Sequence, residues 1–305
     1  MKRKELFLDF YFRKILGYIA ILSPPQAYRL LPLLGNRFRN FKTYPSAYEE
    51  GVLMRGIENL KRTKNYSDAG AKKIIKEYLK YETRFLIENV WIKKRATKKI
   101  QNCFCSYDID LLYRTLRSDT YLIATAHTSG IFLLIALLDA LNLTTPFICM
   151  NMMNMPWEKA TPFQRACQDM WVYWTKFQPL MYVDEGNTIQ KSRDILRSNR
   201  SLALACDVPQ HLRGGVVRLF NLKVRIPFGA SRLANESQKP ILVAIPWTDK
   251  VINPYRIYMT KIFPSGNIKQ DMKFIMEDME CAINKNPSCW NGWLYLDRMM
   301  VEIQF

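Results

Sequence analysis

His127 is the side chain best suited to acid–base chemistry in this chain of 305 residues. It follows an apolar run, 121–126, and a Ser-Gly pair leads from it into a second apolar stretch, 133–141. A histidine between a buried strand and a helix lies at the edge of an α/β sheet where ligands bind, and the following helix offers free N–H groups to an anion. There an imidazole can take a proton from a hydroxyl and activate it for attack on a thioester. The other interpretation is a histidine that only satisfies the hydrogen bonds of a loop.

Two neighbouring nucleophiles are weaker candidates. Ser129 lies on the same turn as His127 and lacks the G-x-S-x-G pattern of a hydrolase nucleophile. Cys206 is expected to be a buried strand cysteine. The seven cysteines contain no C-x-x-C pair and the chain has only two histidines. We therefore predict no disulfide framework, no metal site and no cofactor.

Four apolar runs predict the strands of a central sheet. The first three are continuously apolar, which is typical of strands that helices cover on both faces. Helical patterns at 66–95 and 269–285 complete an α/β protein with a mixed central sheet covered by helices. The four runs are 121–126, 201–205, 240–247 and 255–262.

The N-terminal segment suggests contact with a membrane. Residues 5–22 are rich in Leu, Phe, Tyr and Ile but carry three charges near their centre, and Pro24-Pro25 follow. A spanning helix needs about 20 apolar residues, so we predict a helix that lies in the membrane interface. An ordinary amphipathic core helix is the alternative, and without a cleavage site the segment does not read as a signal peptide. We expect an N-terminal interfacial helical segment over 1–40 and an α/β domain over 41–305.

The charge balance predicts an acidic partner. The chain has 45 Lys and Arg against 27 Asp and Glu, a net charge of +18. Anionic membranes, acidic carrier proteins and nucleic acids all fit such a charge. No helix-turn-helix, zinc-finger or aromatic-basic RNA motif is present, so we do not predict a nucleic-acid partner.

Blocks along most of the chain resemble the lysophospholipid acyltransferase superfamily, and within it the bacterial lipid A late (lauroyl/myristoyl) acyltransferases. No single block is specific, but the ordered set is, and it covers roughly residues 15–300. The similar blocks are the histidine motif at 121–132, an Asn-Leu pair and long helix at 56–88, an Asp, Gly-Gly and aromatic block at 205–234, a strand at 240–246 and an aromatic-plus-Arg block at 290–298.

This resemblance implies transfer of an acyl group from a thioester, on acyl carrier protein or CoA, to a hydroxyl of an anionic membrane glycolipid such as lipid A. The expected location is the cytoplasmic side of the inner membrane. His127 would be the general base. Backbone N–H groups near Ser129 and Gly130, or a nearby arginine, would stabilise the oxyanion.

One position departs from the family's H-x-x-x-x-D/E motif, because Phe132 stands where the acid belongs. Phenylalanine cannot accept a hydrogen bond from the imidazole, which is the acid's role. Asp207 ends the next long apolar strand, in a block that the family keeps beside its histidine, and we expect its carboxylate within hydrogen-bond reach of His127, or one water away. Asp139 is the runner-up, about three helical turns beyond His127. Otherwise His127 works unassisted, or catalysis is lost.

Guanidinium groups are the best candidates for binding acceptor phosphates or sugars, because they bind phosphate bidentately. Each could instead be a solvated surface charge. The candidates are Arg165, Arg213, Arg218 and Arg232.

Two other functions fit the same residues. A divergent enzyme could move an aminoacyl group, such as glycyl, or a hydroxyacyl group from a carrier thioester onto lipid A. A non-catalytic homologue could bind lipid or carrier, and His127 would then be dispensable.

Overall fold

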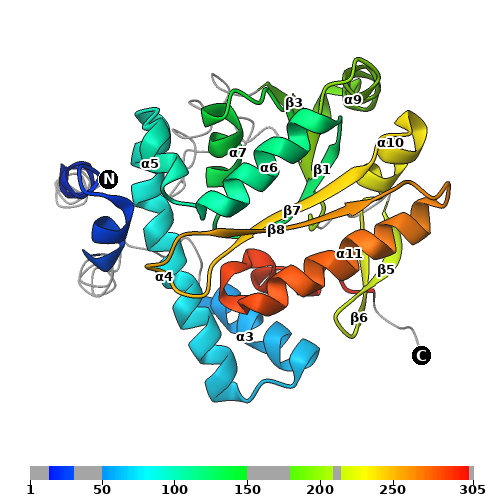
Figure 1. The fold of residues 1–305 in the computed structure, drawn as a ribbon. Coiled ribbons are helices and arrows are strands. Elements are labelled where there is room, and N and C mark those ends of the chain that lie inside the picture. Colours follow the sequence, from blue (N-terminus) through cyan, green and yellow to red (C-terminus); the bar gives the residue numbers. More distant parts are fainter. Residues whose placement is uncertain (1–13, 31–49, 150–178, 209–213, 302–305) are drawn as a thin grey trace.

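A six-stranded sheet forms the centre of the protein (Figure 1). A computed structural model describes residues 14–30, 50–149, 179–208 and 214–301. The strand order is β3-β2-β4-β1-β7-β8. The strands are β1 (Leu122–Thr125), β2 (Phe147–Cys149), β3 (Leu180–Tyr182), β4 (Leu202–Ala205), β7 (Ile241–Trp247) and β8 (Arg256–Ile262).

The sheet is mixed, as predicted. Strands β1, β2, β3, β4 and β7 pair in parallel, and β8 runs antiparallel to β7. The four predicted strand runs are confirmed as β1, β4, β7 and β8. The structure adds β2 and β3, each only three residues long.

Helices cover both faces of the sheet (Figure 1). One core lies between the sheet and α7 (Ile131–Ala140), and the other lies between the sheet and α11 (Ile268–Lys285). The long helix α4 (Asp68–Lys93) belongs to both, because its first half packs in the α11 core and its second half in the α7 core. Ser67 caps its start, since the Ser67 side chain accepts a hydrogen bond from the Gly70 N–H.

Shorter elements complete the chain. Strands β5 and β6 form an antiparallel hairpin on α11, with Phe220 at φ +55° in its turn. The remaining elements are α3 (Glu50–Lys64), α5 (Thr97–Gln101), α6 (Ser106–Ser118), η3 (Val183–Glu185), α9 (Thr188–Arg197), β5 (Gly215–Leu219), β6 (Leu222–Ile226), α10 (Gly229–Ser237), η4 (Pro287–Cys289), η5 (Asn291–Leu294) and η6 (Leu296–Arg298).

The described part of the N-terminal segment packs against the α/β domain. Residues 14–19 and 24–30 are helical, and they bury apolar side chains such as Leu16 and Ala27 in the α7 core. The Trp91 indole of α4 donates to the Ala20 carbonyl at 2.8 Å. Tyr18 and Ile21 point outward, 70% and 68% exposed. The segment therefore presents one apolar side to the domain and two large apolar side chains to the outside.

None of the helices in the described ranges is long and apolar enough to cross a bilayer. Residues 1–13 and the expected boundary between 40 and 41 lie outside the described residues.

Candidate active site

The register of two central strands brings His127 and Asp207 together. Strands β1 and β4 pair in parallel with Thr125 opposite Ala205, and the Cys206 N–H donates to the Thr125 carbonyl at 2.9 Å. Each strand ends at this pair, and two residues beyond its end the chain reaches His127 or Asp207. Residues 80 positions apart thus face each other at the carboxyl edge of the sheet.

This edge is also where the chain changes direction. From β1 the chain enters α7 on one face of the sheet, whereas from β4 it reaches β7 through α10 on the opposite face. In α/β sheets, ligands bind at the point where the connections that leave two neighbouring strands separate in this way. The dyad therefore occupies the position at which the architecture favours binding.

The two side chains are in direct contact. The His127 Nδ1 lies 2.7 Å from Asp207 Oδ1, which meets the distance expected from the sequence. An ionised carboxylate only accepts hydrogen bonds, so Nδ1 carries the proton and Nε2 presents its lone pair. The His127 side chain is 32% exposed, whereas that of Asp207 is fully buried. The arrangement can hold a neutral imidazole that takes a proton at Nε2.

Asp207 is surrounded by hydrogen-bond donors. The His127 backbone N–H reaches both carboxylate oxygens, at 3.1 and 2.9 Å, and the Trp290 indole donates to Oδ2 at 2.7 Å. The Tyr295 hydroxyl lies 3.5 Å from the same oxygen. These donors stabilise a charged carboxylate in a position from which water is excluded.

The pKa values of the pair move in opposite directions. Burial alone would lower the pKa of His127, but the charge of Asp207 and its hydrogen bond outweigh burial and raise that pKa above 6.5. Burial alone would raise the pKa of Asp207, but the interactions with His127 and Trp290 lower it. Mutual stabilisation thus favours the charged carboxylate and makes the imidazole a stronger base.

The C-terminal segment fixes the loop that carries His127. The Asn291 N–H donates to the His127 carbonyl at 3.1 Å, and the Ser129 N–H donates to the Cys289 carbonyl at 2.7 Å. Of the expected oxyanion donors, the Ser129 N–H therefore already donates to another carbonyl. The Gly130 N–H donates to no described residue.

The other carboxylate candidate and the substituted position lie elsewhere. Phe132 packs its ring against Phe85 of α4, with ring centroids 5.1 Å apart. Asp139 lies near the end of α7, about 12 Å along the axis from its start, and burial raises its carboxyl pKa despite the charge of Arg95. Asp139 is therefore too far along the helix to orient the imidazole.

The two predicted arginines that lie in the described residues make their contacts with groups other than the dyad. Arg218 bonds the Phe220 carbonyl and the Asn221 side chain, both at 3.0 Å, and Arg232 pairs with Glu236 at 2.9 Å. Arg165 and Arg213 lie outside the described residues. Cys206 is buried, and burial together with the adjacent Asp207 raises its thiol pKa, which makes it a poor nucleophile.

Trp290 is the site residue that the sequence did not single out. The sequence placed it only in a C-terminal aromatic block, 83 residues from the carboxylate it binds. The signal available was its type, since a buried tryptophan needs an acceptor for its N–H. Nothing in the spacing indicates which acceptor that is.

Replacing Trp290 with phenylalanine tests this hydrogen bond. We expect W290F to lower the free energy of unfolding by about 1.5–3 kcal/mol at pH 7, because the acceptor is charged. Chemical denaturation measures the change, and W91F is the matched control. Trp91 is as deeply buried but donates to a neutral carbonyl, so its hydrogen bond contributes about 1 kcal/mol. Equal losses in the two variants would contradict a charged acceptor at Trp290.

A side chain at position 130 should disturb the loop. A Cβ on Gly130 would lie 2.8 Å from the Cβ of Pro246 and 3.0 Å from the Tyr255 ring. We expect G130A to destabilise the protein by about 1–3 kcal/mol through overpacking, measured as a lower Tm. In the control G229A, nothing lies within 4 Å of the added methyl, and the helix should gain up to about 1 kcal/mol. A G130A protein as stable as the wild type would contradict this packing.

No protein-family model matches the chain, and no curated protein matches it significantly.

Proposed function

We propose that the protein is an acyltransferase that moves an acyl group from a carrier-protein thioester to a hydroxyl of an anionic membrane glycolipid, such as lipid A. The contact between His127 Nδ1 and Asp207 Oδ1 is the observation that carries the catalytic half of this proposal. The sequence blocks that resemble the lipid A late acyltransferases support the substrate class. The Asp207 carboxylate would take the role of the acid that Phe132 replaces.

The proposed reaction needs one proton to move twice. Nε2 of His127 removes the proton of the acceptor hydroxyl while that oxygen attacks the thioester carbonyl. The carbon–sulfur bond then breaks, and the imidazolium returns the proton to the departing thiolate. Asp207 holds the ring in position and stabilises its positive charge. The products are an ester on the glycolipid and a free carrier thiol.

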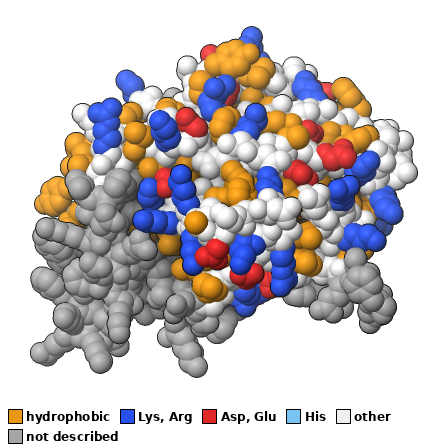
Figure 2. All heavy atoms as spheres, turned by 90° about the horizontal axis from the view of Figure 1, so that it is seen from below, with side chains coloured by type: hydrophobic (Ala, Val, Ile, Leu, Met, Phe, Trp, Pro, Cys, Tyr) orange, Lys and Arg blue, Asp and Glu red, His pale blue; other side chains and the backbone are white. Residues whose placement is uncertain are grey.

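The surface suits an anionic partner. The net charge is +18, and Figure 2 shows more Lys and Arg than Asp and Glu side chains on the face it presents. Such a surface attracts both an acidic carrier protein and anionic lipid. We place the protein at the cytoplasmic side of the inner membrane, where the exposed Tyr18 and Ile21 could enter the interface.

Mass spectrometry of lipid A from cells with and without the gene tests the proposal directly. We expect the gene to add the mass of one acyl chain. Addition of a glycyl or hydroxyacyl mass would instead identify the divergent enzyme that the sequence also allows. An unchanged spectrum under inducing conditions would exclude lipid A as the acceptor.

A further inference from the structure

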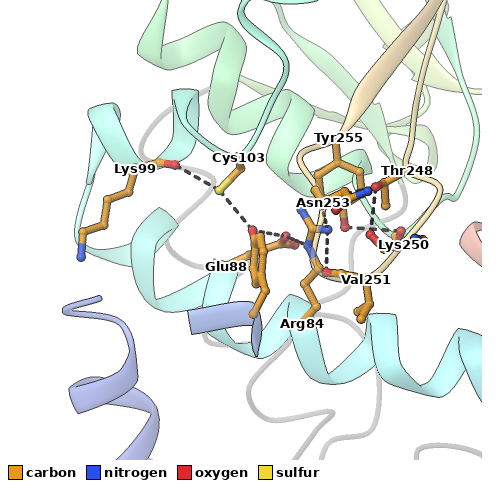
Figure 3. A network of polar contacts seen from close by, with 11 residues as sticks. Arg84, Glu88, Lys99, Cys103, Thr248, Lys250, Val251, Asn253 and Tyr255 are labelled. Atoms are coloured by element: carbon orange, nitrogen blue, oxygen red, sulfur yellow. Dashed lines mark hydrogen bonds and ion pairs between the residues drawn. The ribbon is translucent and has the colours of Figure 1, made fainter. Parts of the chain in front are cut away.

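A buried ion pair in α4 is connected through Tyr255 to the catalytic loop, which is residues 126–130 around His127. The proposed mechanism makes no use of this pair. Arg84 and Glu88 are 0% and 1% exposed, and Arg84 Nε lies 2.6 Å from Glu88 Oε1. Figure 3 shows both side chains at the centre of a network of polar contacts. Burying two charges is costly unless hydrogen bonds satisfy them. The contacts of this pair therefore indicate which segments of the chain it holds together.

Arg84 makes contacts on several sides, although its Nη2 and the Oε2 of Glu88 have no hydrogen-bond partner among the described residues. Its Nη1 donates to the carbonyls of Val251 and Asn253, at 3.0 and 2.8 Å, in the turn between β7 and β8. Its guanidinium carbon lies 3.9 Å from the centre of the Tyr28 ring and 3.8 Å from that of the Tyr255 ring. A planar guanidinium can stack on two rings and still donate from its edge, which a lysine ammonium cannot do.

Tyr255 connects this cluster to the loop of His127. Its hydroxyl lies 3.4 Å from Ser129 Oγ, and its ring packs directly against Gly130. Its backbone is fixed by hydrogen bonds with Cys103 and Cys105, at 2.7 and 2.9 Å. The ring of Tyr255 therefore forms the support behind the turn that follows His127.

Tyr28 connects the same cluster to the N-terminal segment. Its hydroxyl donates to Glu88 Oε1 at 2.8 Å, and its ring forms the opposite side of the Arg84 sandwich. Residues 24–30 thus provide one of the two rings that pack on Arg84. The other ring, Tyr255, contacts the catalytic loop.

We propose that Arg84 is a positioning residue for the catalytic loop: held between Tyr28 and Tyr255, it fixes the Tyr255 ring, which in turn fixes Ser129 and Gly130 behind His127. The N-terminal segment then acts as a buttress of the site in addition to any contact it makes with a membrane. The description of His127 as the base rests on the proposed function, but the positioning of its ring beside Asp207 does not.

The titration of His127, followed by NMR, reports this positioning. The chain has two histidines, so H211Q assigns the His127 ring signals. In R84K the positive charge is kept while the stacking and the fork of hydrogen bonds are lost. We expect the His127 pKa in R84K to fall by about 0.5 or more, because the ring moves away from Asp207. Y255F keeps the ring and removes its hydroxyl, which contacts Ser129 and Glu88, and it should lower the pKa less.

Y121F is the matched control, because Tyr121 is a buried tyrosine, 2% exposed, at the opposite end of β1. Its His127 titration should equal that of the wild type. If R84K does not fold, Y255F carries the test. Folded R84K or Y255F protein that titrates like Y121F would overturn the proposal. If the wild type transfers no acyl group, the proposed function fails, yet the titration still decides the role of Arg84. If it does transfer one, kcat should fall in R84K with KM unchanged.

Discussion

Replacing His127 by alanine should lower the rate of acyl transfer by about 10²–10⁴-fold, the usual contribution of a general base. The imidazole is the group beside Asp207 that can take the proton of an acceptor hydroxyl, and alanine leaves no base in its place. The rate is measured with purified protein, a carrier-bound acyl thioester and lipid A in detergent. The circular dichroism spectrum of H127A should match that of the wild type, because the side chain is one-third exposed.

The same variant separates the three functions in cells. Loss of the lipid A modification in a strain with H127A supports either enzyme, and the mass lost tells them apart. Full retention of the modification would exclude both enzymes and leave the non-catalytic lipid-binding or carrier-binding homologue.

Replacing Asp207 by asparagine should change both the rate and its pH dependence. The amide keeps the shape of the carboxylate but cannot stabilise an imidazolium, and it allows the wrong tautomer, so we expect kcat to fall by about 10³–10⁴-fold. In the wild type the acidic limb of the pH profile lies above pH 6.5, because the interactions with Asp207 outweigh burial and raise the pKa of His127. The base is active only when neutral. In D207N the pKa falls, and the limb should move to lower pH.

The matched control is D139N, which neutralises the runner-up carboxylate on α7. Its pH profile should follow that of the wild type. A shift of the limb in D139N, or its absence in D207N, would show that the imidazole is oriented by another group.

Asp207 also makes the stability of the protein depend on pH. The pKa of Asp207 is lowered from 3.8, so its contribution is present above that pH and lost as the pH falls through the lowered value. The pKa of His127 is raised from 6.5, so its contribution is complete below that pH and lost as the pH rises through the raised value. The pair should therefore stabilise the fold most between about pH 4 and 6.5. Denaturation of wild type and D207N at pH values below, within and above this range measures how much stability the pair contributes at each pH.

The long elements of the fold could be predicted from the sequence because each has a strong local pattern. The apolar runs of β1, β4 and β7 mark strands buried on both faces. Strands β2 and β3 could not be predicted, since three residues carry no period and owe their pairing to the neighbouring strands. The β5–β6 hairpin was missed because its turn places Phe220 at positive φ, where a glycine or asparagine is the usual signal.

The candidate site could be predicted only in part, for a related reason. That His127 and Asp207 each follow a buried strand is visible in the sequence, but that these strands are neighbours is a property of the sheet order. The donors of the C-terminal segment, and the occupation of the Ser129 N–H by Cys289, depend on how that segment folds back. Tertiary contacts of this kind leave no local pattern.

The pairing of β1 with β4 also determines how the site responds to heat. Both strands are interior to the sheet, with β2 on one side and β7 on the other, and interior strands generally open only when the whole domain unfolds. A slip of one residue would turn Asp207 to the opposite face of the sheet. Activity should therefore survive heating until the protein melts, and the amides of 123–125 and 203–206 should be among the slowest to exchange with deuterium.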